Sequence, residues 1–160
     1  MEIRTATAED LEGIARIEAE CFPAAEAASR QSIRARLTAY PTHFWLLLDG
    51  KKIVGFVNGM VTDEPDLRDE MYDDAGIHDE NGAWQMIFGV DTLPAYRRRG
   101  CAGWLLEHVI AEARRQGRKG LVLTCKEALI HYYAKFGFVS EGVSQSTHGN
   151  VLWYQMRLAF

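Results

Sequence analysis

The residue pattern with the clearest chemistry is an arginine- and glycine-rich turn, Arg97-Arg98-Arg99-Gly100-Cys101-Ala102-Gly103. It opens a strongly amphipathic helix that we predict from Arg98 to about Arg115. The first amide N–H groups of a helix lack intrahelical partners and carry the positive end of its dipole, so they bind anions. Small residues at 100, 102 and 103 allow a ligand to approach the main chain, and arginines suit phosphate oxygens. The turn therefore predicts a phosphate site.

Other phosphate-binding motifs are missing. The sequence holds neither G-x-G-x-x-G nor a glycine-lysine-serine/threonine triplet, which excludes the Rossmann and kinase classes. Spacing alone leaves a second interpretation open, because glycine and arginine are also common at helix starts with no ligand.

A second charged feature is an acidic stretch with nine carboxylates and one arginine. An acidic run is usually solvated surface that keeps a protein soluble. The alternative is that part of it lines the entrance for a cationic amine and raises its local concentration. Tyr72, Trp84 and Trp153 could add an apolar wall, although core packing explains them equally. The carboxylates are Asp63, Glu64, Asp66, Asp69, Glu70, Asp73, Asp74, Asp79 and Glu80.

The composition is that of an ordinary globular domain. The 160 residues are 48% hydrophobic and 25% charged with a net charge of −4, which argues against a nucleic-acid or membrane partner. The three cysteines are scattered and odd in number, so we expect reduced thiols, no metal site and a cytoplasmic location. Residues 1–160 fit one domain.

The elements that must position these residues alternate between strand and helix. The order predicts an α/β domain with one mixed, mostly antiparallel sheet of about seven strands and helices on both faces. Asp49-Gly50-Lys51-Lys52 joins a hairpin, and the acidic stretch is a long loop or one short helix. Strands are expected at 2–7, in the two arms of the hairpin at 43–61, and at 83–92, 121–125, 138–145 and 151–158; helices are expected at 8–21, 26–39, 98–115 and 127–136.

Two motifs on these elements resemble the GCN5-related N-acetyltransferase (GNAT) superfamily. R-x-x-G-x-A after a long strand and P-x-Y resembles its pyrophosphate-binding turn. CKEALIHYYAKFGF resembles its later helix with a Gly-Phe ending, and more narrowly its arylalkylamine branch. The motif-level likeness runs from about Ile87 to Phe138, and the order of elements matches over nearly the whole chain.

The resemblance implies acetyl-CoA as cofactor and an acetyl group passed directly to a primary amine in a ternary complex. The pantetheine arm would bind main-chain groups of Phe88, Val90 and Thr92. The pyrophosphate would lie on the turn, which adds Arg97, Arg98, Arg99, Gly100, Cys101, Ala102 and Gly103 to the cofactor site. Tyr133, four residues before Gly137, takes the place of the general acid. Packing of an aromatic residue is its other interpretation, which suits the adjacent Tyr132.

The chain lacks the histidines that serve as the general base in the arylalkylamine branch. The two histidines of that branch fall on Met86 and Phe88 here. Substitutes would be a carboxylate of 63–80, His78, His148 or a water chain.

The missing base makes a catalytically silent acyl-CoA-binding module the first alternative function. A purely structural domain is the other alternative, but it would not explain the arginine-glycine turn. Within enzymes, a protein N-terminus, a lysine, an aminoglycoside or an amino acid are alternative acceptors to a small-molecule amine. Apolar edge strands would suit a homodimer.

Overall fold

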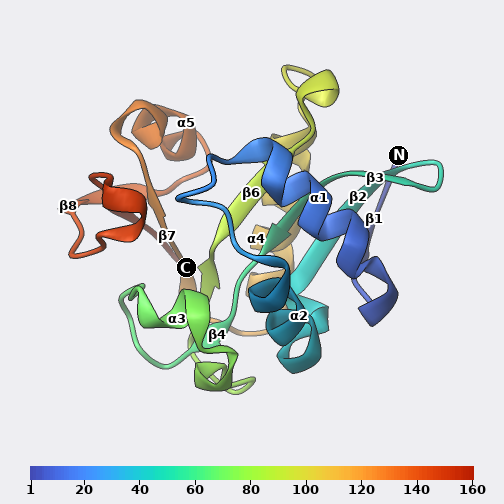
Figure 1. Ribbon diagram of the computed structural model, residues 1–160. Helices are drawn as coiled ribbons and strands as arrows, with labels where there is room; N and C mark the ends of the chain where they lie inside the picture. The colour runs from blue at the N-terminus through green and yellow to red at the C-terminus, as the bar shows by residue number, and fades with distance from the viewer.

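Nine strands form two hydrogen-bonded groups in the computed structural model, which describes residues 1–160 (Figure 1). The first group has the order β1-β2-β3-β6 and the second β4-β5-β7-β9-β8. Only β5 and β7 pair in parallel, so the predicted mixed, mostly antiparallel arrangement is confirmed. The strands are β1 Glu2–Thr5, β2 Phe44–Asp49, β3 Lys52–Asn58, β4 Val61–Thr62, β5 Trp84–Ile87, β6 Gly89–Thr92, β7 Gly120–Cys125, β8 Val139–Val143 and β9 Tyr154–Ala159.

The count exceeds the predicted seven by two, because the second hairpin strand is broken into β3 and β4 and the long strand expected at 83–92 is divided into β5 and β6. Phe88 interrupts it, and its amide N–H donates to the Asn58 carbonyl (2.7 Å). Beyond this residue the chain changes partner, from β7 alongside β5 to β3 alongside β6. At Phe88 the chain therefore passes from the second group of strands to the first.

Helices cover both faces of the strands, as predicted. In Figure 1, α1 and α2 lie in front of the strands and α4 lies behind them. One core packs Leu105, Leu106 and Val109 of α4 against one face, and the other packs Ile14 and Ile33 of α1 and α2 against the opposite face. The helices are α1 Leu11–Cys21, α2 Arg30–Ala39, α3 Glu70–Asp73, α4 Cys101–Arg115 and α5 Ile130–Ala134.

The helix expected from Glu26 begins four residues later, at Arg30. Ser29 caps it by accepting a hydrogen bond from the Ser32 amide (3.1 Å), and this leaves residues 22–29 as a loop. The acidic stretch is irregular apart from α3 and one turn of 3-10 helix, which agrees with the prediction. None of the helices has both the length and the apolar character needed to cross a bilayer.

Candidate functional site

The site begins where two neighbouring strands separate. β5 and β7 pair in parallel up to Ile87 and Leu123. Beyond that point β6 pairs with β3 on one side, and its other edge has no strand partner. The gap that follows leaves Thr124 and Cys125 facing Gly89 and Val90 across a cavity of about 250 Å³.

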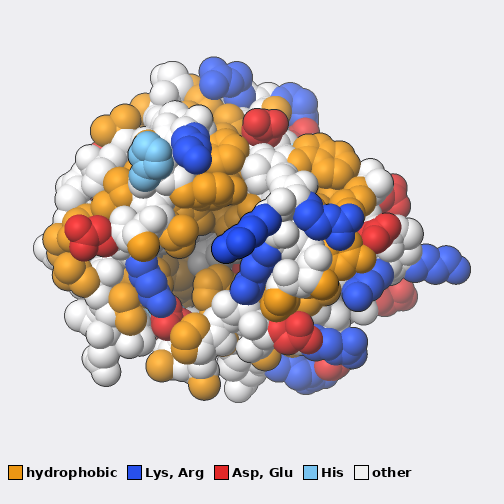
Figure 2. Space-filling view, turned by 90° about the horizontal axis from the view of Figure 1, so that it is seen from above, with side chains coloured by type: hydrophobic (Ala, Val, Ile, Leu, Met, Phe, Trp, Pro, Cys, Tyr) orange, Lys and Arg blue, Asp and Glu red, His pale blue; other side chains and the backbone are white.

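Side chains from six parts of the chain line this cavity, and a second cavity of about 190 Å³ extends it toward α2. The two share Glu18, Glu26, Tyr72, Phe88 and His148. Figure 2 views the end of the molecule that is uppermost in Figure 1, where basic side chains gather around a hollow with a hydrophobic interior. The first cavity is completed by Cys21, Phe22, Pro23, Gly89, Val90, Thr124, Cys125, Lys126, Leu129, Tyr133 and Trp153.

The arginine-glycine turn has the geometry that an anion site requires. Gly100 is left-handed (φ 79°), and the first hydrogen bond of α4 runs from the Trp104 amide to the Gly100 carbonyl (3.0 Å). The amides before Trp104 therefore have no helical acceptor. Gly103 has a packing role that the sequence did not reveal, since a methyl group there would lie 3.3 Å from the Phe136 ring.

The predicted main-chain positions on β6 are not equivalent. The Leu93 amide donates to the Val54 carbonyl (2.9 Å), so alternation directs the main chain of Val90 away from β3 and toward the gap. The amide of Phe88 is already bonded to Asn58. The carbonyl of Thr92 accepts from Arg97 Nε (3.2 Å) and from Cys21 Sγ (3.3 Å). Val90 is the position of the three with the main chain directed at the gap and no such contact.

Tyr133 lies at the cavity and its neighbour does not. Tyr133 is 9% exposed, lines the cavity and packs edge-on against Tyr132 and Phe138. Burial raises the pKa of its hydroxyl, which therefore stays protonated at neutral pH. Tyr132 packs on Phe136 and is absent from the lining.

Two glutamates at the cavity were not among the site residues predicted from the sequence. Glu18 of α1 is 7% exposed, and Glu26 follows in the loop after α1. Glu26 Oε1 lies 2.9 Å from Lys126 Nζ, which forms an ion pair inside the cavity lining. An apolar helix stripe that includes a glutamate was the available signal for Glu18, and Glu26 had none.

His148 is brought to the cavity by the turn before β9. Its Nε2 lies 2.7 Å from the Glu26 carbonyl, so this nitrogen carries a proton and donates it to that oxygen. Its ring stacks on Tyr72 (5.1 Å), whose hydroxyl lies 3.1 Å from Thr124 Oγ1. Tyr72 and Trp153 thus form part of the predicted apolar wall, whereas Trp84 lies under Arg157 instead.

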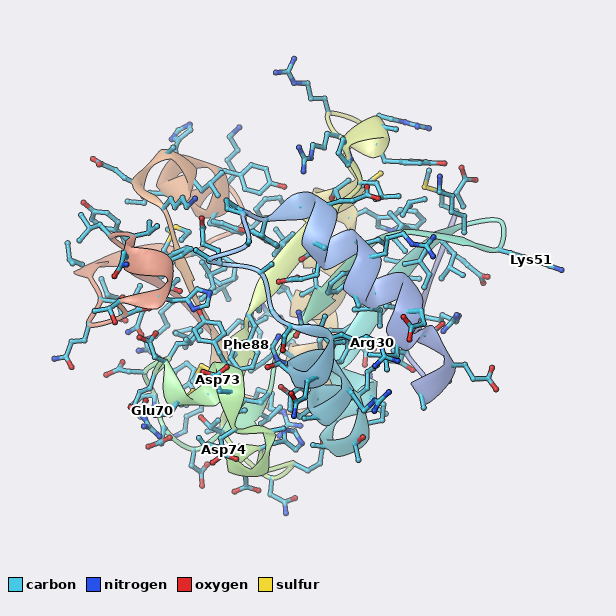
Figure 3. The ribbon with its side chains drawn as sticks, in the orientation of Figure 1. Arg30, Lys51, Glu70, Asp73, Asp74 and Phe88 are labelled. Atoms are coloured by element: carbon cyan, nitrogen blue, oxygen red, sulfur yellow. The ribbon has the colours of Figure 1, made fainter.

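The acidic stretch is mainly surface. Every one of its nine carboxylate residues is exposed except Asp69, which is half-buried. Figure 3 shows Glu70 and Asp74 on the outside and Phe88 in the interior. Asp73 alone of the nine contributes to the lining of either cavity, at the extension.

The two positions that replace the histidines of the arylalkylamine branch offer no base. Met86 is fully buried in the core. Phe88 packs against Tyr72 (4.9 Å) and under the Arg36 guanidinium (5.0 Å).

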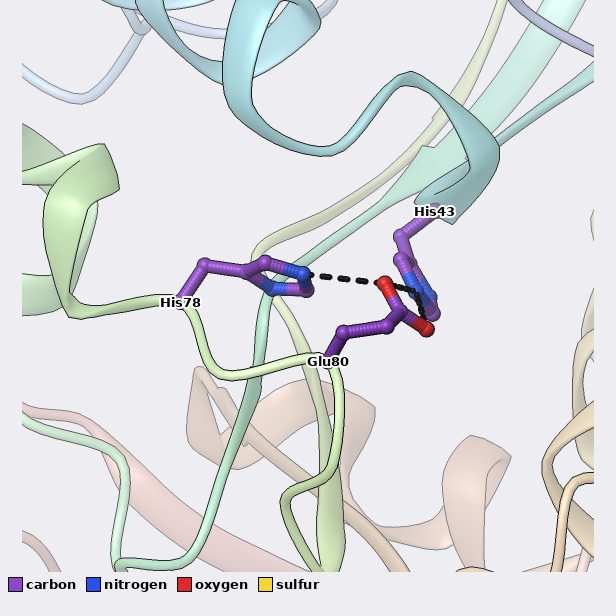
Figure 4. A group of neighbouring side chains, drawn as sticks. All are labelled: His43, His78 and Glu80. Atoms are coloured by element: carbon purple, nitrogen blue, oxygen red, sulfur yellow. Dashed lines mark hydrogen bonds and ion pairs between the residues drawn. The ribbon is translucent and has the colours of Figure 1, made fainter.

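His43, His78 and Glu80 form a separate cluster whose ligand atoms lie within 4.8 Å of one another (Figure 4). The Gln85 amide nitrogen donates to carbonyls, so its oxygen accepts from His43 Nδ1 (2.9 Å). The Val61 amide donates to His78 Nδ1 (3.0 Å), which leaves the proton on Nε2 facing Glu80 (3.1 Å).

A metal would need the lone pair of that His78 nitrogen, so the cluster fits a hydrogen-bonded ion pair better than a metal site. Arg118 adds a further charge, 3.0 Å from Glu80. His78 does not line either cavity, which removes it from the candidate bases.

Comparison with known proteins shows which family and which solved structures this chain is similar to. The model of the acetyltransferase (GNAT) family matches residues 11–138. The GphF GNAT-like decarboxylase in complex with isobutyryl-CoA is 25% identical, with a TM-score of 0.86 over 99% of both chains. The loading GNATL domain of CurA from Lyngbya majuscula is 17% identical, with a TM-score of 0.85 over 99% of this chain and 96% of that one.

The ribosomal-protein-S18-alanine N-acetyltransferase from Escherichia coli is 20% identical, with a TM-score of 0.74 over 99% of this chain and 92% of that one. A search of the curated proteins finds no match. These comparisons do not single out the arylalkylamine branch, which stays a prediction.

Proposed function

The chain belongs to the GNAT acetyltransferase family, and from that premise we propose that it transfers an acetyl group from acetyl-CoA to a small primary amine. The amine attacks the thioester carbonyl directly in a ternary complex, and Tyr133 protonates the departing thiolate. The observation that carries the proposal is the position of Tyr133, a buried residue of the cavity lining between the separated strands, where burial favours the protonated form of its hydroxyl.

The cofactor would lie along the unpaired edge of β6 and end at the turn. Main-chain groups of Phe88, Val90 and Thr92 are proposed to hold the pantetheine arm, and the amides of 97–103 the pyrophosphate. The free main chain of Val90 and the left-handed Gly100 support this path. The carboxylates of Glu18 and Glu26 at the cavity favour a cationic acceptor.

Tyr133→Phe tests the assignment. We expect kcat to fall about 100-fold because the thiolate must leave without a proton, with little change in the KM for acetyl-CoA. Tyr132→Phe is the matched control, since it removes a hydroxyl from the adjacent ring outside the cavity, and it should keep wild-type kcat. Wild-type turnover in Tyr133→Phe would remove the assignment.

A second candidate function is decarboxylation of an acyl-CoA that carries a carboxylate on its acyl group. The observation in its favour is the 25% identity to a GNAT-like decarboxylase over nearly the full length of both chains. The glutamates of the cavity oppose it, because they would repel a second carboxylate.

One assay separates these functions. Acetyl-CoA with a panel of amines should yield free thiol and acetylated amine by mass spectrometry, whereas malonyl-CoA alone should release no carbon dioxide. The reverse result would assign the decarboxylase function. Binding of acetyl-CoA with neither product would assign the catalytically silent module.

A further inference from the structure

Two carboxyl groups lie close together at the cavity, and neither of them is bonded to a cation. Asp91 of β6 is 0% exposed and Glu18 of α1 is 7% exposed. A methyl group added at Gly89 would lie 3.0 Å from Asp91 Oδ1 and 3.8 Å from Glu18 Oε1. Both side chains therefore reach the same point over Gly89, a residue of the cavity lining.

The hydrogen bonds around this pair leave room for one shared proton. Neither oxygen of Asp91 receives a hydrogen bond from any N–H or O–H donor. Glu18 Oε2 accepts from the Ala28 amide (2.9 Å), and its carboxyl is hydrogen-bonded to Asp91 once a proton lies between them. Burial, and then the charge of Glu18, raise the pKa of Asp91 well above its usual value, so Asp91 holds that proton.

Other charged and titratable groups surround the pair. Arg36 of α2 donates to Asn58 Oδ1 (3.0 Å) and to the Tyr72 carbonyl (2.9 Å), which fixes one positive charge nearby. Cys21 of α1 and Tyr133 of α5 are the other titratable groups close enough for their charge to act on that of Asp91. With both thiol and phenol protonated, one arginine balances the one negative charge of the pair.

We propose that Glu18 is the proton acceptor for the amine and that Asp91 is a positioning residue that holds Glu18 as the anion. This inference rests on the proposed acetyl transfer. A cationic amine releases one proton to solvent before it reacts, and its nitrogen loses a second proton to Glu18 when it forms the bond to the acetyl carbon. The C–S bond then breaks, and the sulfur takes a proton from Tyr133. Exchange with solvent returns the proton from Glu18 and reprotonates Tyr133.

The rival bases at the cavity are less available than Glu18. Glu26 is already paired with Lys126 (2.9 Å). His148 is held by the Glu26 carbonyl through Nε2 and keeps only Nδ1 for a proton. Glu18 instead lines both cavities with no cation bonded to it, and its one protein donor besides Asp91 is a main-chain amide.

Three variants test the two roles. Glu18→Gln should lower kcat at least 100-fold and leave the Kd for acetyl-CoA unchanged. Asp91→Asn keeps a donor toward Glu18, so its kcat and pH profile should stay within about threefold of wild type. Asp91→Val removes the donor from a buried carboxylate, so the acidic limb of the rate profile should move to higher pH. Thermal unfolding of each variant checks that it is folded.

Infrared difference spectroscopy can detect the proton held by Asp91 in the absence of any substrate. Wild-type protein at neutral pH should show the carbonyl stretch of a protonated carboxylic acid, and Asp91→Asn should lose it. Persistence of that band in Asp91→Asn, or wild-type kcat in Glu18→Gln, overturns the inference and leaves acetyl transfer standing. Failure of the wild type to acetylate any amine overturns the proposed function and the role of Glu18 together.

Discussion

The two sides of the central cavity are built in different ways. The side proposed for the cofactor is one continuous stretch from β6 to the start of α4, and it offers main-chain groups and backbone turns. The opposite side is assembled from side chains of α1, the following loop, α3, β7 and the turn before β9. Glu18, Tyr72, Thr124 and His148 meet there although as many as 130 positions separate them along the chain.

This difference sets which substitutions should matter on each side. A site made of main-chain groups tolerates side-chain changes unless they alter the backbone conformation. A site made of side chains responds to each change of charge or hydrogen bonding. The cofactor side should therefore be sensitive at its left-handed glycine, and the acceptor side at its carboxylates.

The largest effect in this comparison is expected for Gly100→Ala. Gly100 and Gly117, just before and just after α4, are both left-handed (φ 79° and 78°), and neither has an atom within 4 Å of an added methyl group. Both alanine variants should lose about 1 kcal/mol of unfolding free energy from the same strain.

Only Gly100→Ala should weaken CoA binding, by about tenfold, because relief of the strain would turn the amides away from the pyrophosphate. Isothermal titration calorimetry with CoA measures both variants. Equal CoA affinities in Gly100→Ala and Gly117→Ala would show that the turn does not hold the cofactor.

A smaller effect is expected on the acceptor side from Glu26→Gln. The variant leaves Lys126 without its partner and should raise the KM of a cationic amine about fivefold at low salt, with an unchanged Kd for CoA. The control is Glu70→Gln combined with Asp74→Asn, which removes two exposed charges outside the cavity. That control should stay within about twofold of wild type, and an equal rise would assign attraction to the surface instead.

The part of the fold and site that could be predicted is the part encoded locally. The stripe of α4, the apolar β7 and the glycine turn each depend on residues close together in sequence, and all three are present; α4 begins at Cys101, three residues after the predicted start, and only Thr124 of β7 is half-buried. The split of the long strand at Phe88 could not be predicted, because it depends on a hydrogen bond to Asn58, thirty positions away.

The acceptor side could not be predicted for the same reason. Asp91 lies in a strand that pairs with β3, and only the packing of α1, which lies far earlier in the chain, against that strand places Glu18 beside it. A buried carboxylate in sequence looks like any surface one. The acidic stretch agrees with its first interpretation as solvated surface, and its one half-buried member, Asp69, accepts a hydrogen bond from Ser146.

The smallest effect is expected for a substitution at Asp69, which holds in place the loop that carries His148. Its carboxylate accepts from Ser146 Oγ (2.5 Å) and from the Thr147 amide (3.0 Å), directly before His148. Asp69→Asn removes the negative charge that both donors face, so the bond from the Thr147 amide weakens and the Ser146 hydroxyl must reorient to accept from the new amide group. The amine KM should rise about threefold with an unchanged Kd for CoA, and amide hydrogen exchange should quicken over 144–150.

Asp66→Asn is the control for that loop, because it weakens an exposed ion pair with Arg157 (2.9 Å) at β9 without touching residues 144–150. It should leave both the amine KM and the exchange of the loop unchanged. If Asp69→Asn quickens exchange and the amine KM stays constant, then His148 and its loop lie outside the path of the acceptor. The acceptor side would then reduce to the glutamates and the aromatic residues on the α1 and α3 side of the cavity.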